Sequence, residues 1–178
     1  MGQYYYGVYL DVSGAVVGWM CPFFAGMKLM EHSYIGNEFV STFEWELTPE
    51  GCFHKSSVVW TGDYADLEPD KKRNLYHICK NSKELEIVGG ADIKSTINYQ
   101  YLVNHTTRQF VNKSKIPKDS DGLRIHPLPL LTCEGNKRGG GDFYGESTLI
   151  GSWARDVISA EKSAPEGFTE LAFDVRED

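Results

Sequence analysis

The feature that most constrains the fold is a series of short apolar and aromatic segments separated by brief polar turns. Residues 3–12 and 15–20 flank Ser13 and Gly14, and residues 99–103 and 109–112 flank a turn around His105. Segments of this kind favour β-strands, and strands joined by tight turns pair antiparallel. The sequence therefore predicts a mostly antiparallel sheet of about six to nine strands.

Two segments have a helical rather than a strand pattern. In residues 37–47 the apolar side chains lie on one helical face, Asn37 is suited to the N-cap, and Thr48 and Pro49 follow the end. Residues 71–80 predict a second helix. No linker or internal repeat divides the chain, so we expect one α+β domain over residues 1–178, with about two helices packed on one face of the sheet.

Other segments have weaker patterns. Residues 26–31 and 57–60 favour strands, and residues 85–88 a short one. Residues 123–132 contain Pro127 and Pro129, which favours an edge strand or an extended segment. Residues 156–161 and 168–175 predict a further hairpin.

Composition excludes some classes of function. The net charge is -7 and the pI about 5.2, which argues against general nucleic-acid binding. The apolar runs are too short to span a membrane, and no secretory leader is evident, so we expect no membrane partner and a cytoplasmic location. The four cysteines lack zinc-like spacing and are expected to be free thiols.

The stretch 132–156 contains the most distinctive local sequence. Gly139, Gly140 and Gly141 are consecutive, Lys137 and Arg138 precede them, and Asp142 follows. Glycine backbone N–H groups beside basic side chains can form an anion-binding concavity. The alternative is a solvated hairpin tip. Neither a P-loop motif nor GxGxxG is present.

Acidic residues also lie in a turn after a predicted strand. Asp63 and Asp66 occur in the sequence GDYAD, and Arg155 and Asp156 begin a later strand. If these turns meet, arginines and glycine N–H groups can hold phosphate, or carboxylates can bind Mg²⁺. Alternatively, Asp63 and Asp156 cap turns and Arg155 forms an internal ion pair. The candidate ligand-binding residues are Asp63, Tyr64, Asp66, Glu134, Asn136, Arg138, Gly139, Gly140, Gly141, Asp142, Trp153, Arg155 and Asp156.

Several segments together resemble a family of phage and bacterial proteins that has no established activity. The shared patterns are MGQYY at the start, GDYAD at 62–66, and an EGNxRGGGD…IGxWARDxI ending within 126–158. In some members GGGD and GSWAxD segments lie directly before GDYAD, which implies that 153–158 and 58–66 are neighbours. Phage carriage implies an interaction with host defence or metabolism.

Two functions of different classes follow. The first is a non-catalytic binding protein that needs no cofactor and sequesters an anionic, nucleotide-like small molecule or blocks a host protein. The sequence is compatible with assembly of this protein into a homo-oligomer. The second is a metal-assisted hydrolase or transferase acting on a phosphorylated substrate, with Asp63, Asp66, Asp142 and Asp156 as Mg²⁺ ligands. A third hypothesis is a purely structural or self-assembling protein. No serine or cysteine nucleophile motif is present.

Overall fold

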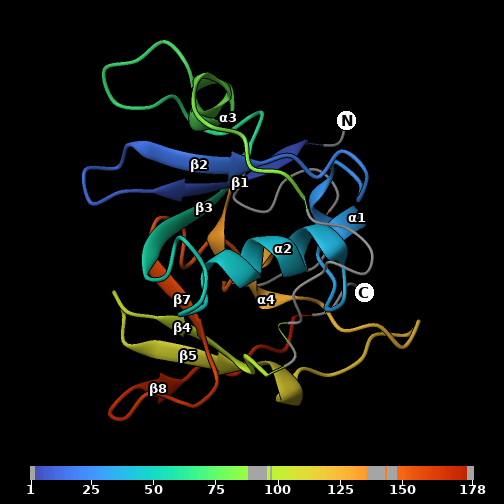
Figure 1. Ribbon diagram of the computed structural model, residues 1–178. Helices are drawn as coiled ribbons and strands as arrows, with labels where there is room; N and C mark the ends of the chain where they lie inside the picture. Colours follow the sequence, from blue (N-terminus) through green and yellow to red (C-terminus); the bar gives the residue numbers. More distant parts are fainter. Residues whose placement is uncertain (1–2, 88–95, 97, 136–142, 144–147, 176–178) are drawn as a thin grey trace.

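The computed structural model describes residues 3–87, 96, 98–135, 143 and 148–175. Its centre is one eight-stranded sheet with the order β2-β1-β3-β7-β4-β5-β8, in which β6 also pairs with β3 (Figure 1). Among the described strands only the β3–β6 and β5–β8 pairs are parallel, so the predicted α+β fold with a mostly antiparallel sheet is confirmed. The strands are β1 (Tyr5–Leu10), β2 (Val16–Met20), β3 (Ser56–Gly62), β4 (Tyr101–Asn104), β5 (Gln109–Asn112), β6 (Cys133–Glu134), β7 (Val157–Glu161) and β8 (Thr169–Glu170).

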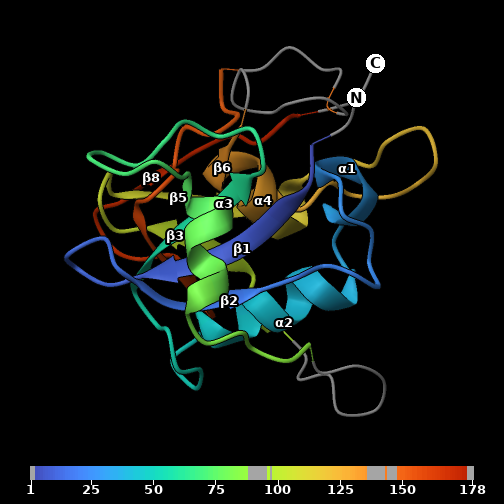
Figure 2. The ribbon, with the colours of Figure 1, turned by 90° about the horizontal axis from the view of Figure 1, so that it is seen from above.

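Helices cover both faces of the β1–β2–β3 part of the sheet, instead of the single face expected. The helices of the described residues are α1 (Leu29–His32), α2 (Glu38–Glu46), α3 (Leu75–Ile78) and α4 (Pro127–Thr132), with the 3-10 helices η1 (Cys79–Asn81) and η3 (Lys113–Lys115). Figure 1 shows α2 and α4 between the upper strands and β4, β5 and β8, whereas α3 covers the opposite side of β1 and β2 (Figure 2).

The alternation of β1 explains this double cover. Tyr5 and Tyr9 point into the larger core beneath α2, and Tyr6, Val8 and Leu10 point into a smaller core beneath α3. Successive side chains of a strand face opposite sides, so a strand buried throughout needs a partner layer on each side.

Helix α2 confirms the predicted segment 37–47. The Asn37 side chain accepts hydrogen bonds from the N–H groups of Phe39 and Val40, which caps the first turn. Phe43 stacks on Tyr9 with ring centroids 4.0 Å apart. A Cβ atom at Gly7 would lie 2.6 Å from the Phe43 ring, so the absence of a side chain at Gly7 lets α2 approach the strand.

The second predicted helix is shorter than 71–80. Asn74 caps α3 by accepting the His77 N–H, and α3 continues into η1. The Asn74 amide also donates to the backbone oxygens of Asp63 and Ala65, at 2.9 and 3.2 Å. The cap of α3 therefore also fixes the GDYAD turn.

Two extended predictions were wrong. Residues 26–31 contain the start of α1, and residues 127–132 form α4. In α4 both prolines fall in the first turn, where backbone N–H groups have no intrahelical acceptor, so proline does not break the helix. The His126 ring accepts the Leu128 N–H at 3.2 Å and caps it.

The predicted C-terminal hairpin was also wrong. β7 inserts between β3 and β4, whereas β8 pairs in parallel with β5. At 85–87 there is no strand, only a bridge between Glu84 and Trp19, and residue 88 lies outside the described residues. The β1–β2 and β4–β5 hairpins are as predicted. Among the described helices, none has the length and apolar character needed to cross a membrane.

Candidate functional site

Strand β3 has two neighbours on the same edge. Its start pairs with β7 through Ser56 and Ser57, and its end pairs with β6 through Trp60 and Thr61. The chain before β7 fills the gap between them, because the Arg155 N–H donates to the Val58 oxygen at 2.7 Å. Residues 153–158 and 58–66 are therefore neighbours, as the family resemblance implied.

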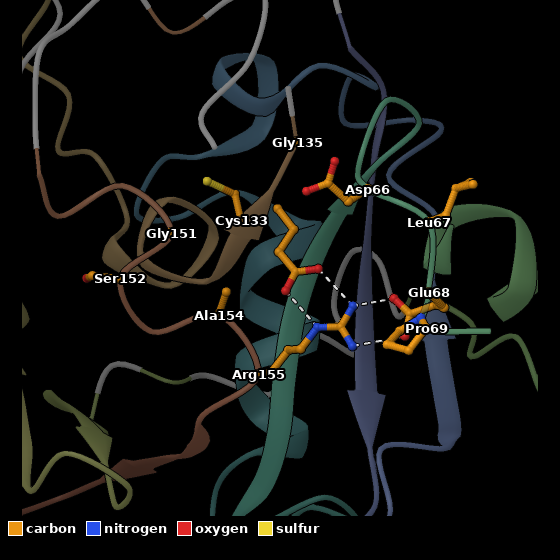
Figure 3. Close-up of a pocket in the computed structure, with 11 residues that line it drawn as sticks. Asp66, Leu67, Glu68, Pro69, Cys133, Gly135, Gly151, Ser152, Ala154 and Arg155 are labelled. Carbon is orange, nitrogen blue, oxygen red and sulfur yellow. Dashed lines mark hydrogen bonds and ion pairs between the residues drawn. The ribbon is translucent and has the colours of Figure 1, made fainter. Parts of the chain in front are cut away.

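A cavity of about 450 Å³ opens where these segments meet (Figure 3). We call it the arginine pocket. The first wall is the segment that comes after β3 in the sequence. The second wall is β6 with the residue after it, and the third is the segment before β7. The lining residues are Asp66, Leu67, Glu68, Pro69, Cys133, Glu134, Gly135, Gly151, Ser152, Ala154 and Arg155.

Arg155 joins two of these walls. Its Nε and Nη2 donate to the two carboxylate oxygens of Glu134 at 2.6 and 2.9 Å, and its Nη1 and Nη2 donate to Glu68 (Figure 3). These bonds raise the pKa of Arg155, Glu134 contributing first and Glu68 second. The backbone of Arg155 has φ of 67°, a left-handed conformation that is strained for any residue with a Cβ.

The described lining is acidic. Asp66, Glu68 and Glu134 supply three carboxylates against the single guanidinium of Arg155. Carboxylates bind two edges of the guanidinium and use four of its five N–H donors, so Arg155 mainly positions Glu68 and Glu134. This part of the pocket suits hydrogen-bond donors of a ligand.

Of the predicted site residues that the structure describes, three line this pocket, namely Asp66, Glu134 and Arg155. Asp63 accepts the Tyr4 N–H at 3.1 Å, and Asp156 accepts from the Asn104 amide at 2.7 Å. The ion pairs of Arg155 match the structural alternative set out above, whereas the side chains of Asp63 and Asp156 bind residues distant in the sequence and do not cap their own turns through these contacts. The other predicted residues with a described position are Tyr64, which is half exposed, and Trp153, which is buried.

The remaining predicted residues lie outside the described residues. They are Asn136, Arg138, Gly139, Gly140, Gly141 and Asp142. Asn136 directly follows Gly135, a lining residue of the arginine pocket.

Glu68 is the main pocket residue that the sequence prediction missed. It lies two residues beyond GDYAD, next to Pro69, and its carboxylate binds a residue 87 positions later in the chain. The acidic turn was the available signal, and extending it by two residues would have included Glu68.

The second predicted function requires converging carboxylates. Within the described part of the chain, no group of three or more His, Cys, Asp or Glu residues is arranged to hold a metal ion. Asp63 and Asp156 have separate partners, as given above. Comparison of the chain with family models, curated proteins and solved structures gave no match.

Proposed function

We propose that this protein is a non-catalytic binding protein that sequesters a nucleotide-like small molecule in the arginine pocket. The observation that carries the proposal is the fixed geometry of Arg155 between Glu68 and Glu134 at the wall of an open cavity of about 450 Å³. That volume lies within the range of small-ligand sites. Polar groups that are already fixed lose little conformational entropy when a ligand binds, which favours affinity.

The nucleoside end and the phosphate end of such a ligand need different binding partners. Carboxylates accept hydrogen bonds from ribose hydroxyls or from amino groups of a base, and Asp66, Glu68 and Glu134 supply them in the pocket. The phosphate end needs cations or free N–H groups. We assign this end to Lys137, Arg138 and the three glycines, which follow Gly135 in the sequence and lie outside the described residues.

The proposed biological role comes from the family resemblance. A phage protein that retains a host nucleotide without consuming it would lower the concentration available to a host defence pathway. The proposed setting is the host cytoplasm. All four cysteines are free thiols, which is the state that thiols keep in a reducing compartment.

Native mass spectrometry of the protein purified from its host cells tests this proposal. We expect a retained small molecule that is recovered chemically unchanged after denaturation and whose binding is insensitive to EDTA. Arg155→Ala and Arg138→Ala should each lower nucleotide affinity, whereas Arg73→Ala, an exposed arginine outside the pocket lining, should not.

Two results would oppose the proposal. Consumption of a phosphorylated compound that stops with EDTA would favour the Mg²⁺-dependent enzyme instead. Failure of every nucleotide and cyclic nucleotide in a panel to bind would exclude the proposed ligand class.

A further inference from the structure

A second, smaller cavity of about 210 Å³ lies beside the first turns of α2, away from the arginine pocket. We call it the lysine cavity. Its walls come from α2, from η3 after β5, and from the segment before α4. The lining residues are Ile35, Gly36, Ser41, Glu44, Thr96, Gln100, Lys113, Ser114, Arg124 and His126.

Local pairing brings Arg124 and His126 to this cavity. The Ile35 N–H donates to the Arg124 oxygen and the His126 N–H donates to the Ser33 oxygen, both at 2.9 Å. Side chains alternate along such an extended pair, and Ile125 between them is buried in the core. Arg124 and His126 therefore share the side that faces the cavity.

A buried charge network forms the floor. Glu44 accepts a hydrogen bond from the Lys113 ammonium, and its other oxygen lies 3.4 Å from Nε2 of His126. The His126 Nδ1 accepts the Leu128 N–H, which leaves the proton of the neutral ring on Nε2, directed at Glu44. Burial opposes ionisation of Glu44, but Lys113 and His126 lower its pKa to about 2. Glu44 is thus ionised and satisfied by partners on both oxygens.

The groups left available to a ligand are cationic or hydroxylic. An ammonium has three N–H donors, and Glu44 is the only acceptor that Lys113 has among the described residues. Arg124 is exposed, and its guanidinium has no partner within the described part of the chain. Ser41 adds a hydroxyl group to the lining, whereas the Ser114 hydroxyl already donates to the Asn112 side chain at 2.8 Å.

We propose that the lysine cavity is a binding site for a small oxyanion, held by Lys113 and Arg124. Its volume of about 210 Å³ is below that of drug-sized ligand sites, so it admits inorganic phosphate or a small carboxylate and excludes a nucleotide. The site is therefore distinct from the arginine pocket in both charge and size, and it does not depend on the function proposed there.

The test is a titration of the ¹⁵N-labelled full chain with inorganic phosphate at constant ionic strength, with sulfate, acetate and chloride as parallel arms. We expect saturable amide shifts at Ser41, Gln100 and Ser114 with phosphate and none with chloride. Saturable shifts of the same amides with sulfate or acetate would also support a site for small oxyanions. Arg124→Gln should weaken phosphate binding about tenfold, because a charge-assisted hydrogen bond is lost. Arg124 is exposed, so this variant should fold normally.

Arg73→Gln is the matched control, since it removes the same charged group from an exposed position outside the cavity. Its phosphate affinity should stay within about twofold of the wild type. Equal weakening in both variants, shifts that fall elsewhere, or no saturation with phosphate would each overturn the proposal.

Discussion

The arginine pocket and the lysine cavity both combine acidic and basic side chains, but in opposite proportions. In the first, one guanidinium lies between two carboxylates, and the side chains of Arg155, Glu68 and Glu134 are 36%, 12% and 29% exposed. In the second, one carboxylate lies between an ammonium and an imidazole, and Lys113, Glu44 and His126 are 10%, 1% and 3% exposed. The central group of each set is largely engaged by its partners, so the flanking groups set the sign of the charge offered to a ligand.

The difference in burial has an energetic consequence. Water screens the partly exposed ion pairs of Arg155, whereas the buried pair of Lys113 and Glu44 has lost its hydration. Removing one member should therefore affect stability strongly at the lysine cavity and weakly at the arginine pocket.

Lys113→Met should have the largest effect, because it leaves the Glu44 carboxylate buried without its main counter-charge. We expect a loss of about 3–5 kcal/mol in the free energy of unfolding, measured by urea denaturation. Lys115→Met is the control. Lys115 is 64% exposed and pairs with Glu170, so its loss should stay below about 1 kcal/mol. Similar losses in the two variants would contradict the contrast in burial.

Acidification should also destabilise the side of the molecule beneath α2. Burial lowers the pKa of His32 to about 4 from 6.5, and burial likewise lowers the pKa of His126, against the effect of Glu44. Below pH 6.5 His32 binds a proton in the unfolded chain, but in the folded chain it does not do so until about pH 4. The free energy of unfolding therefore decreases as the pH is lowered through this window. His32 alone accounts for about 2 kcal/mol between pH 7.5 and 5.

Urea denaturation of His32→Gln at several pH values measures this dependence. The variant should show a shallower fall in stability between pH 7.5 and 5 than the wild type. His77→Gln, at an exposed position, should keep the wild-type dependence. A wild-type slope that persists in His32→Gln would contradict the assignment.

At the arginine pocket, two replacements separate ion pairing from backbone strain. Arg155→Ala should lower stability by about 1–2 kcal/mol, because the lost ion pairs are partly exposed and a left-handed conformation is still imposed on a residue with a Cβ. Arg155→Gly should lose about 0.5 kcal/mol less, since relief of strain exceeds the entropy that glycine adds to the unfolded state. Thermal unfolding of both variants distinguishes them, and a less stable glycine variant would show that the φ of 67° is not strained.

Arg124→Gln should have the smallest effect on folding. The side chain is exposed and has no partner among the described residues, so the free energy of unfolding should change by less than about 0.5 kcal/mol. Urea denaturation checks this value. A larger loss would mean that Arg124 stabilises the fold, and weaker phosphate binding in this variant could then not be assigned to a lost contact.

The parts of this fold that were predictable have local causes. Asn37 and the apolar spacing of α2 lie within one segment, and the β1–β2 and β4–β5 hairpins follow from their turns. The prediction missed α4 because Pro127 and Pro129 were interpreted as favouring an edge strand or extended segment, without regard to the first turn of a helix, where proline is tolerated. The positions of β7 and β8 depend on pairing with distant strands, which no local pattern specifies.

The same distinction applies to the sites. The GDYAD turn and Arg155 were identifiable as polar groups beside strands, but the sequence did not show that Arg155 binds Glu68. The pair of Lys113 and Glu44 joins residues 69 positions apart, and neither residue belongs to a recognisable motif. They meet only in the folded protein, where Glu44 lies on α2 and Lys113 in η3 directly after β5.

The most direct test of nucleotide binding in the arginine pocket is isothermal titration calorimetry. The wild type and Glu134→Gln are each titrated with a panel of nucleotides and cyclic nucleotides in the presence of EDTA. Glu134 is the predicted acceptor for ligand hydrogen-bond donors, and its replacement removes one carboxylate from the pocket. We expect that at least one nucleotide binds the wild type and binds Glu134→Gln about tenfold or more weakly. Equal binding by both proteins, or no binding by the wild type, would contradict this expectation.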